Sequence, residues 1–214
     1  MIKTVIFFRR RPGMGLAAFQ EHWRTAHAEL IVKLPGIRRY VQNHVLPAQA
    51  GGAEPAFDAV AESSFDDTQA MKTLAKSPEY AVVLADEPDF IDRATMGMIV
   101  TEEHVLKDGP VPPDAVKSIA LINRRSGMHV EEFFRDWREA HGPRVAALPG
   151  VCRYVQCHTR RSAYDSGRTP AFDGAAMAWL DGVAAPAEAT AAHSDPKRSV
   201  QLLARELVVL AGNP

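Results

Sequence analysis

The stretch Phe19–His44 reads FQEHWRTAHAELIVKLPGIRRYVQNH, and its pattern decides the fold expected for this chain. Apolar residues recur at steps of three and four in its first part, which predicts a helix whose apolar face carries Trp23 and His27. Leu34-Pro35-Gly36 ends that helix. The residues beyond it alternate as in a strand, and one face of that strand carries Tyr40, Gln42 and His44.

The same arrangement returns in Phe133–His158, which reads FFRDWREAHGPRVAALPGVCRYVQCH. Residues 2–45 align with residues 116–159 at a constant offset of 114 without a gap, and 18 of the 44 aligned pairs are identical. A further match, Pro55–Asp58 with Pro170–Asp173, follows at an offset of 115. The chain is therefore an internal duplication. Shared residues can be shared for packing, so the repeat by itself defines no site.

Each repeat is predicted to run strand, helix, strand, strand, helix, strand. In the first repeat the strands are expected at residues 2–10, 37–45, 57–65 and 95–106, and helices at 15–33 and 67–76. Residues 79–92 are expected to form a further short stretch that is either helical or irregular. In the second, strands are expected at 116–124, 151–159, 172–180 and 200–210, and helices at 130–148 and 186–192. The equivalent of 79–92 is largely missing there. The order βαββαβ is the ferredoxin-like unit.

Three prolines and one glycine fall within residues 107–114, which indicates an extended linker. The predicted domains are therefore a first repeat at 1–106, a linker at 107–115 and a shortened second repeat at 116–214. An open sheet covered by helices on one face needs cover on the other. We therefore expect an α+β protein in which the two units pack sheet to sheet as an intramolecular pseudo-dimeric barrel.

Composition excludes several classes of protein. The chain has 25 basic and 26 acidic residues, so it lacks the positive charge that nucleic acids or anionic membranes attract. No apolar run is long enough to span a bilayer, and the N-terminal residues lack the order of a secretory signal, so a cytoplasmic location is expected. Cys152 and Cys157 point to opposite faces of one predicted strand, which favours free, reduced thiols.

These motifs resemble the EthD family of the dimeric α+β barrel superfamily, present twice in tandem. The resemblance rests on Arg11–Met14, on Trp23 with His27, and on Leu34–His44, together with their counterparts in the second repeat. It implies ferredoxin-like units that associate through their sheets. Fungal members act as dehydratases or decarboxylases of polyketide-derived aromatics, and the superfamily also includes isomerases, cyclases, cofactor-free monooxygenases and haem enzymes. The fold thus implies a small-molecule enzyme but no single reaction.

Candidate catalytic residues lie in the opening stretch. His27 is predicted to act as a general acid and base at the helix–sheet boundary, with a hydrogen-bonded core histidine as the competing interpretation. Tyr40 and His44 could position a substrate carbonyl or phenol. A solvated strand end is the competing interpretation for His44.

Substrate-binding candidates include Trp23 and Gln42, and three ionisable residues that the second repeat replaces. Glu62, His22 and Arg9 correspond to Met177, Asp136 and Asn123, so the first repeat is predicted to be the active half. Charged residues are usually solvated, which is the alternative for these three. The equivalent candidates in the second repeat are Trp137, His141, Tyr154 and His158.

No metal or nucleotide motif is present, because HExxH, CxxC, a P-loop and GxGxxG are all missing from the sequence. We therefore predict no metal site and no bound organic cofactor. A pocket histidine could ligate haem, but no sequence signal demands it.

The leading hypothesis is cofactor-free proton transfer on a cyclic or polyketide-like hydroxy-carbonyl compound, by isomerisation, cyclisation, dehydration or decarboxylation. One alternative is a non-catalytic accessory or ligand-binding protein of a catabolic oxygenase system. Another is an oxidoreductase or monooxygenase. The expected partner is a hydrophobic or aromatic small molecule, and the paired repeats could form a further homodimer.

Overall fold

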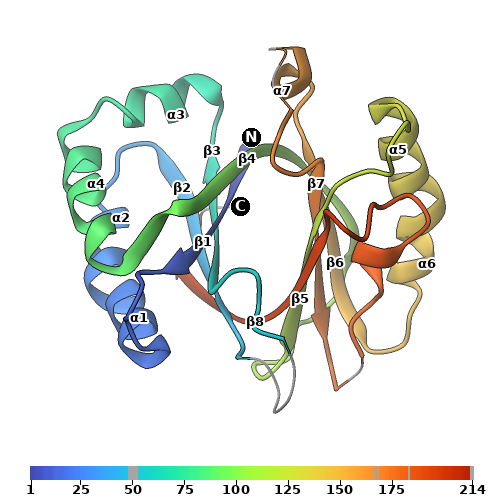
Figure 1. Ribbon diagram of the computed structural model, residues 1–214, viewed down its shortest axis with the longest axis horizontal. Coiled ribbons are helices and arrows are strands. Elements are labelled where there is room, and N and C mark those ends of the chain that lie inside the picture. Colours follow the sequence, from blue (N-terminus) through green and yellow to red (C-terminus); the bar gives the residue numbers. More distant parts are fainter. Residues whose placement is uncertain (48–52, 166, 168, 183, 213–214) are drawn as a thin grey trace. The chain divides into compact units, whose positions relative to one another are not determined.

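The computed structural model describes residues 1–47, 53–165, 167, 169–182 and 184–212 (Figure 1). The chain forms two compact units. Unit 1 consists of residues 1–98 and 206–214, and unit 2 of residues 99–205. Two strands, β4 (Ile91–Asp108) and β8 (Val200–Leu210), each contribute residues to both units. The unit boundaries therefore lie within strands, and the proline-rich segment at 107–115 belongs to unit 2.

The sheet of unit 1 is antiparallel and follows the ferredoxin-like order. Strands β1 (Ile2–Arg10) and β2 (Ile37–Val45) both pair with β3 (Ala59–Phe65). The first part of β4 lies beyond β1 and the end of β8 lies beyond β2. The predicted bounds of β1 and β2 are confirmed, as is the βαββαβ order.

Figure 1 shows the helices of unit 1 on one side of these strands. The first helical segment comprises α1 (Leu16–His22), the π-helical turn η1 (Trp23–His27) and α2 (Ala28–Ile31). A π-helical turn inserts an extra residue into a helix, and such turns are frequent at functional sites. The segment ends near Gly36, whose φ of 77° is a conformation that glycine adopts readily.

Two further helices complete unit 1. Helix α3 (Thr68–Leu74) begins after Asp67, whose side chain accepts a hydrogen bond from the backbone N–H of Ala70 at 2.8 Å. Helix α4 (Pro78–Phe90) begins after Ser77, which caps it in the same way. The predicted helix at 67–76 is thus confirmed to within about two residues, and the stretch at 79–92, expected to be helical or irregular, is helical.

Unit 2 repeats the same sheet. Strands β5 (Val116–Ile122) and β6 (Val151–Thr159) pair antiparallel with β7 (Gly174–Leu180). The second part of β4 pairs with β6, and the first part of β8 pairs with β5. The helical segment comprises α5 (Val130–Arg135), the π-helical turn η2 (Asp136–His141) and α6 (Gly142–Ala146). A short helix, α7 (Ser162–Asp165), follows β6.

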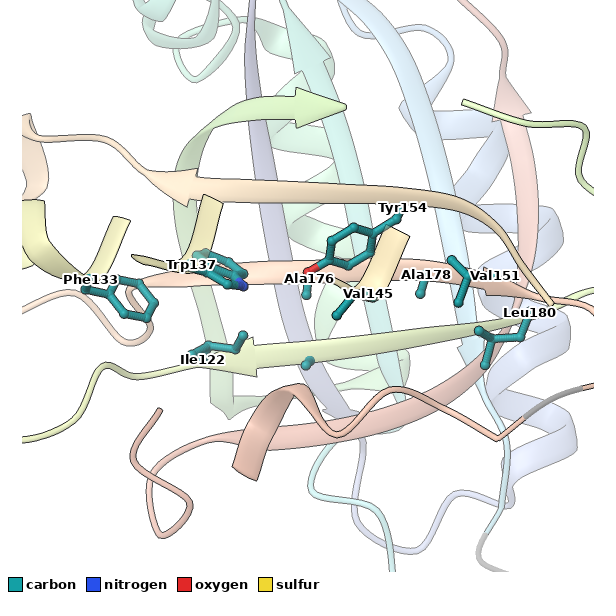
Figure 2. Close-up of a cluster of buried hydrophobic side chains, with 10 residues drawn as sticks. Ile122, Phe133, Trp137, Val145, Val151, Tyr154, Ala176, Ala178 and Leu180 are labelled. Carbon is teal, nitrogen blue, oxygen red and sulfur yellow. The ribbon is translucent and has the colours of Figure 1, made fainter. Parts of the chain in front are cut away.

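The core of unit 2 lies between this helical segment and the strands (Figure 2). Trp137 and Phe133 are fully buried, and their rings stack with centroids 5.2 Å apart. Tyr154 belongs to the same cluster, so its aromatic ring packs in the core while its hydroxyl requires a polar partner. The periodicity of the sequence predicted that these side chains face inward, and this prediction is confirmed.

The predicted helix at 186–192 was wrong. The structure has only a short 3-10 turn, η3 (Glu188–Thr190), within an otherwise irregular segment. Glu188 is 2 % exposed, so its side chain points into the interior instead of occupying a solvated helix surface. Ser194 Oγ donates to the Glu188 carbonyl at 2.9 Å and fixes the segment that follows. The hydrogen bonds that Tyr154 and Trp137 donate to the Glu188 carboxylate therefore override the local helix preference of this alanine-rich stretch.

Both cysteines are free thiols, as expected from their alternation on β6. Within the part of the chain that the structure describes, no helix is both long enough and apolar enough to cross a membrane.

Candidate active site in unit 1

A cavity of about 240 Å³ lies in unit 1, between the sheet and its helices. Its walls are mainly apolar and come from β1, β2, β3, the first helical segment, α3, α4 and the start of β4. Polar side chains reach the wall at a few points: Thr4, His27, Tyr40, Ser63, Lys72, Tyr80 and Glu87. An apolar cavity with a few convergent polar groups is typical of a small-molecule site.

His27 is held by a carboxylate from α4. Its Nδ1 lies 2.8 Å from Oδ2 of Asp86, and His22 Nε2 lies 2.9 Å from Oδ1 of the same residue. An ionised carboxylate only accepts hydrogen bonds, so both imidazoles donate to it. When His27 is neutral its proton is therefore on Nδ1, and Nε2 carries the free lone pair.

Burial keeps His27 in this neutral form. The side chain is 5 % exposed, and desolvation lowers the pKa of His27 below its ordinary value, although Asp86 acts in the opposite direction. A neutral imidazole with an oriented Nδ1–H and a free Nε2 is the arrangement of a general base.

Tyr40 supplies a hydroxyl to the same cavity. Trp23 Nε1 donates to Tyr40 Oη at 3.0 Å, and both side chains are buried. Burial raises the pKa of Tyr40 well above its ordinary value, so the phenol keeps its proton. Among the described residues none accepts that proton, which leaves Tyr40 able to donate to a molecule in the cavity.

Gln42 and His44 lie beside Trp23 but do not line the cavity. Gln42 Nε2 donates to the Trp23 carbonyl at 2.6 Å, and His44 Nε2 lies 3.1 Å from Gln42 Oε1. The imidazole of His44 packs against the indole, with ring centroids 4.7 Å apart. Burial first, and then the nearby charge of Arg24, lower the pKa of His44 to about 4. Both residues therefore hold Trp23 in place.

The other predicted binding residues lie outside the cavity. Glu62 points to the opposite face of β3 from the cavity residue Ser63, and accepts from Lys3 Nζ at 2.9 Å and Asn43 Nδ2 at 3.0 Å. Arg9 is exposed and donates to two backbone carbonyls of the loop before β3. His22 does not line the cavity, and it contacts His27 indirectly, through their shared partner Asp86.

Helix α4 contributes residues that the sequence reading did not single out. Besides Asp86, it places Glu87 at the cavity, 4 % exposed. Its Oε2 makes no hydrogen bond but lies 3.4 Å from Arg93 Nε, and burial raises the pKa of Glu87. The available signal was that residues 79–92 are present in one repeat only and contain several acidic residues.

Unit 2 contains the same framework. Gln156 Nε2 donates to the Trp137 carbonyl at 2.9 Å, and His158 Nε2 lies 3.1 Å from Gln156 Oε1. The rings of Trp137 and His158 stack with centroids 4.8 Å apart. Burial, followed by the charges of His104 and Arg138, lowers the pKa of His158 to about 3. All four predicted candidates of the second repeat thus gather at one place.

In unit 2 the carboxylate of Glu188 lies among the side chains of Tyr154, Trp137 and His141. Tyr154 Oη donates to Glu188 Oε1 at 2.6 Å, and Trp137 Nε1 donates to Oε2 at 3.3 Å. His141 Nε2 lies 3.2 Å from Oε2, at ion-pair distance but without the geometry of a hydrogen bond. Glu188 comes from η3, the segment that replaces α3 and α4.

His193 adjoins this cluster. Its Nδ1 lies 3.4 Å from Asp136 Oδ2, and its buried Nε2 has no hydrogen-bond partner in the described part of the chain. Ligand atoms of His141, Glu188 and His193 all lie within 4.8 Å of one another. Two imidazoles and one carboxylate are a donor set suited to zinc or iron(II). The sequence predicts no metal site, and these three residues form no recognised motif, so they are a candidate donor set that no sequence pattern indicates.

The fold and the site define a class: an α+β protein of two ferredoxin-like units, one of which encloses an apolar cavity with a histidine–carboxylate pair. The EthD domain model matches residues 11–94 and 125–201, so the chain belongs to the EthD family. The resemblance drawn from the motifs is confirmed, in both repeats.

Two solved structures that cover the whole chain agree with it in fold. An anthrone oxidase-like protein is 10% identical with a TM-score of 0.62, and the match covers 100% of this chain and 96% of that one. A provisionally named monooxygenase from Fusobacterium nucleatum is 9% identical with a TM-score of 0.61, covering 100% and 95%. An EthD family protein from Bacillus halodurans is 23% identical over 49% of this chain and all of its own, with a TM-score of 0.41. A search of curated proteins finds no match.

Proposed function

We propose that this chain is a small-molecule enzyme that moves protons on a cyclic or polyketide-like hydroxy-carbonyl compound in the cavity of unit 1. The observation that carries the proposal is the 2.8 Å contact between His27 Nδ1 and Asp86, inside an apolar cavity that also receives the Tyr40 hydroxyl. Neither step below requires a bound organic cofactor. Isomerisation, cyclisation and dehydration share these steps, and decarboxylation shares the hydrogen bond to the carbonyl and the delivery of a proton to carbon after carbon dioxide leaves.

His27 is the general base. Its Nε2 removes a proton from the carbon next to the substrate carbonyl, and the imidazolium that forms is stabilised by Asp86. General acid–base catalysis of this kind contributes a factor of about 10²–10⁴. In the next step the imidazolium returns its proton to carbon, or to a hydroxyl that leaves as water.

Tyr40 is the complementary donor. Its hydroxyl hydrogen-bonds to the carbonyl oxygen, where negative charge develops as the proton leaves carbon. Loss of one such donor costs a factor of about 10²–10³ in rate. Trp23, Gln42 and His44 are positioning residues for Tyr40 and the cavity wall, and His22 positions Asp86. Glu62 and Arg9 act on the structure around the site and not on the substrate.

Solvent exchange tests the proposal without a known product. Proton NMR in deuterated water measures exchange of the hydrogens next to the carbonyl in a panel of cyclic hydroxy-ketones. The wild-type protein is expected to catalyse exchange in at least one compound, and His27→Ala should lower the rate by a factor of about 10² or more. His141→Ala is the matched control and should leave the rate unchanged. Equal rates for wild type and His27→Ala would refute the assignment.

Two other functions use the same cavity. A non-catalytic accessory protein of a catabolic oxygenase system would bind such compounds without exchanging their protons, so the exchange assay separates it from an enzyme. An oxidoreductase is suggested only by the names of proteins about a tenth identical in sequence, whose likeness shows the fold. Oxygen consumption tests that function, and a Soret absorption band tests its haem-dependent form.

We also propose that the two repeats pair through their sheets as a pseudo-dimeric barrel. The support is that β4 and β8 each contribute residues to both units, so the two sheets are continuous through covalent strands. Solution scattering tests the pairing, because a compact protein of this length has a radius of gyration of about 17 Å. A clearly larger monomer radius would contradict it, and the mass from the same data would show a further homodimer.

A further inference from the structure

We infer that the cavity of unit 1 contains a carboxylate subsite, formed by Tyr40, Trp23 and His27, and that the substrate is a cyclic or aromatic acid. The inference rests on the proposed function for the choice of site. It narrows the substrate class from hydroxy-carbonyl compounds in general to those that carry an acid group. Binding tests it independently of turnover.

The first step is that the two units hold the same three side chains in the same framework. The glutamine-to-carbonyl contacts are 2.6 and 2.9 Å, the histidine-to-glutamine contacts are both 3.1 Å, and the indole–imidazole centroids are 4.7 and 4.8 Å apart. These contacts fix each tryptophan, and the tyrosine lies on the same strand face two residues before the glutamine. One contact differs, because Trp23 Nε1 donates to Tyr40 Oη in unit 1 whereas Trp137 Nε1 donates to Glu188 in unit 2. A carboxylate bound in unit 1 would take over the N–H of Trp23.

The second step is that unit 2 shows which group fits. The carboxylate of Glu188 accepts from Tyr154 and Trp137 and lies at ion-pair distance from His141. It thus contacts the equivalents of all three residues of the proposed subsite. A carboxylate is buried at little cost only when charge-assisted hydrogen bonds replace its hydration, and this framework supplies them.

The third step is that the corresponding position in unit 1 is the cavity. Trp23, His27 and Tyr40 all line it, so a carboxylate in contact with them lies inside it. Neither Asp86 nor Glu87 of α4 takes the place of Glu188. Asp86 binds the other nitrogen of His27, and Glu87 lies near Arg93. The subsite therefore remains free for an acid supplied by a ligand.

The rest of the cavity wall indicates the size and polarity of the non-acidic part of that ligand. Phe8, Ile31, Leu34, Phe65 and Val83 are among its apolar side chains. The volume of about 240 Å³ exceeds the roughly 150 Å³ of an apolar cavity that holds benzene. One ring, or two fused rings, bearing a carboxylate at the end near Tyr40 fits this distribution.

The orientation of His27 adds a consequence for protons. Nδ1 donates to Asp86, so Nε2 can donate to a carboxylate only when the imidazole is charged. Binding of a carboxylate should therefore take up one proton at neutral pH. In that complex His27 is the proton donor of the proposed acid–base pair, and it acts as the base only when the carbonyl group, and not the carboxylate, lies against Nε2. Asp86 and His22 adjoin His27 directly, and Tyr40, Tyr80, Glu87 and Lys72 are the other titratable groups of the cavity wall.

Calorimetry on the full-length protein tests the inference with 2-naphthoate and the neutral 2-naphthamide as probes. Wild type is expected to bind naphthoate at least tenfold more tightly than the amide. Tyr40→Phe should weaken naphthoate binding about tenfold and leave the amide almost unchanged, because it removes one charge-assisted hydrogen bond. The matched control Tyr154→Phe should change neither.

Titrations in buffers of different ionisation enthalpy measure proton uptake. Wild type should take up about one proton per naphthoate, and His27→Gln should take up none while retaining amide binding. Equal affinity for the acid and the amide, or an equal loss in Tyr40→Phe and Tyr154→Phe, would overturn the inference. If the protein prefers naphthoate to naphthamide but catalyses no proton exchange, the inference stands and the proposed enzyme is refuted. If it catalyses exchange in neutral ketones but shows no preference for the acid, the proposed enzyme stands and the inference is refuted.

Discussion

The two units share one framework but differ in what covers it. Unit 1 covers Trp23, His27 and Tyr40 with α3 and α4 and leaves a cavity among them. Unit 2 covers Trp137, His141 and Tyr154 with an irregular segment and inserts Glu188 instead. The duplicated helix and strand position the polar groups, while the segment between the third and fourth strands decides whether they face a cavity or a carboxylate of the protein.

The two acidic residues also approach the histidines differently. Asp86 binds Nδ1 of His27 and leaves Nε2 free for chemistry. Glu188 lies against Nε2 of His141 and so blocks the equivalent atom. Under the proposed function, unit 1 is the active half, and Glu188 occupies in unit 2 the position that a ligand would take in unit 1.

The largest expected effect is the loss of proton-exchange rate when the carboxylate that holds His27 is replaced. Asp86→Asn keeps the shape of the side chain but can donate to His27 Nδ1, which favours the wrong tautomer and removes the charge that stabilises the imidazolium. The rate of proton exchange should fall by a factor of about 10³, on the scale of general acid–base catalysis. The control Asp136→Asn in unit 2 should leave the rate unchanged, and an equal loss in both variants would remove the distinction between the units.

The next prediction concerns the stability of unit 2. Glu188→Ala leaves the buried donors of Tyr154 and Trp137 unpaired, at about 1–3 kcal/mol for each orphaned group. We expect a loss of about 2–4 kcal/mol in the free energy of unfolding, measured with urea. Hydrogen exchange should locate the loss in β6 and β7. Glu188→Gln, which retains an acceptor for Tyr154, should lose less, and unchanged stability in both variants would contradict the role of Glu188.

The acid sensitivity of unit 2 provides a third comparison. Burial lowers the pKa of His158 to about 3 and that of His193 to about 4, against about 6.5 in the unfolded chain. The unfolded state thus binds protons that the folded state rejects, so stability falls as the pH drops below about 6.5, down to about 4 for His193 and about 3 for His158. Each group contributes up to about 1.4 kcal/mol per pH unit.

His158→Gln should reduce the slope of unfolding free energy against pH between about pH 6 and pH 4. The reduction should correspond to about one proton fewer taken up on unfolding. Urea titrations at several pH values measure this slope. A slope that His158→Gln does not alter would show that His158 is protonated in the fold.

The smallest effect is expected for His22→Asn. This residue donates to Asp86 at 2.9 Å without lining the cavity, so its loss removes one of two donors that position the carboxylate. A single hydrogen bond to a charged group contributes about 1.5–3 kcal/mol, of which only the part expressed in the transition state affects rate. Exchange should slow about tenfold, with the pH of half-maximal rate shifted. A loss as large as that of Asp86→Asn would make His22 a direct participant.

Periodicity in the sequence determined the duplication, the βαββαβ order and the inward faces that carry Trp23, His27 and Tyr40. These properties depend on spacings of two, three and four residues, so they can be read locally. It also identified the first repeat as the one richer in ionisable groups, although Glu62 and Arg9 proved to lie outside the cavity.

Only the tertiary structure decided the partners of these residues. Asp86 lies 59 positions from His27, and Glu188 lies 34 positions from Tyr154. No local pattern records such separations, because the contacts arise when a covering segment folds back over the sheet. The residues of the helix and strand were therefore predictable, whereas the cavity in one unit and the carboxylate that fills its counterpart were not.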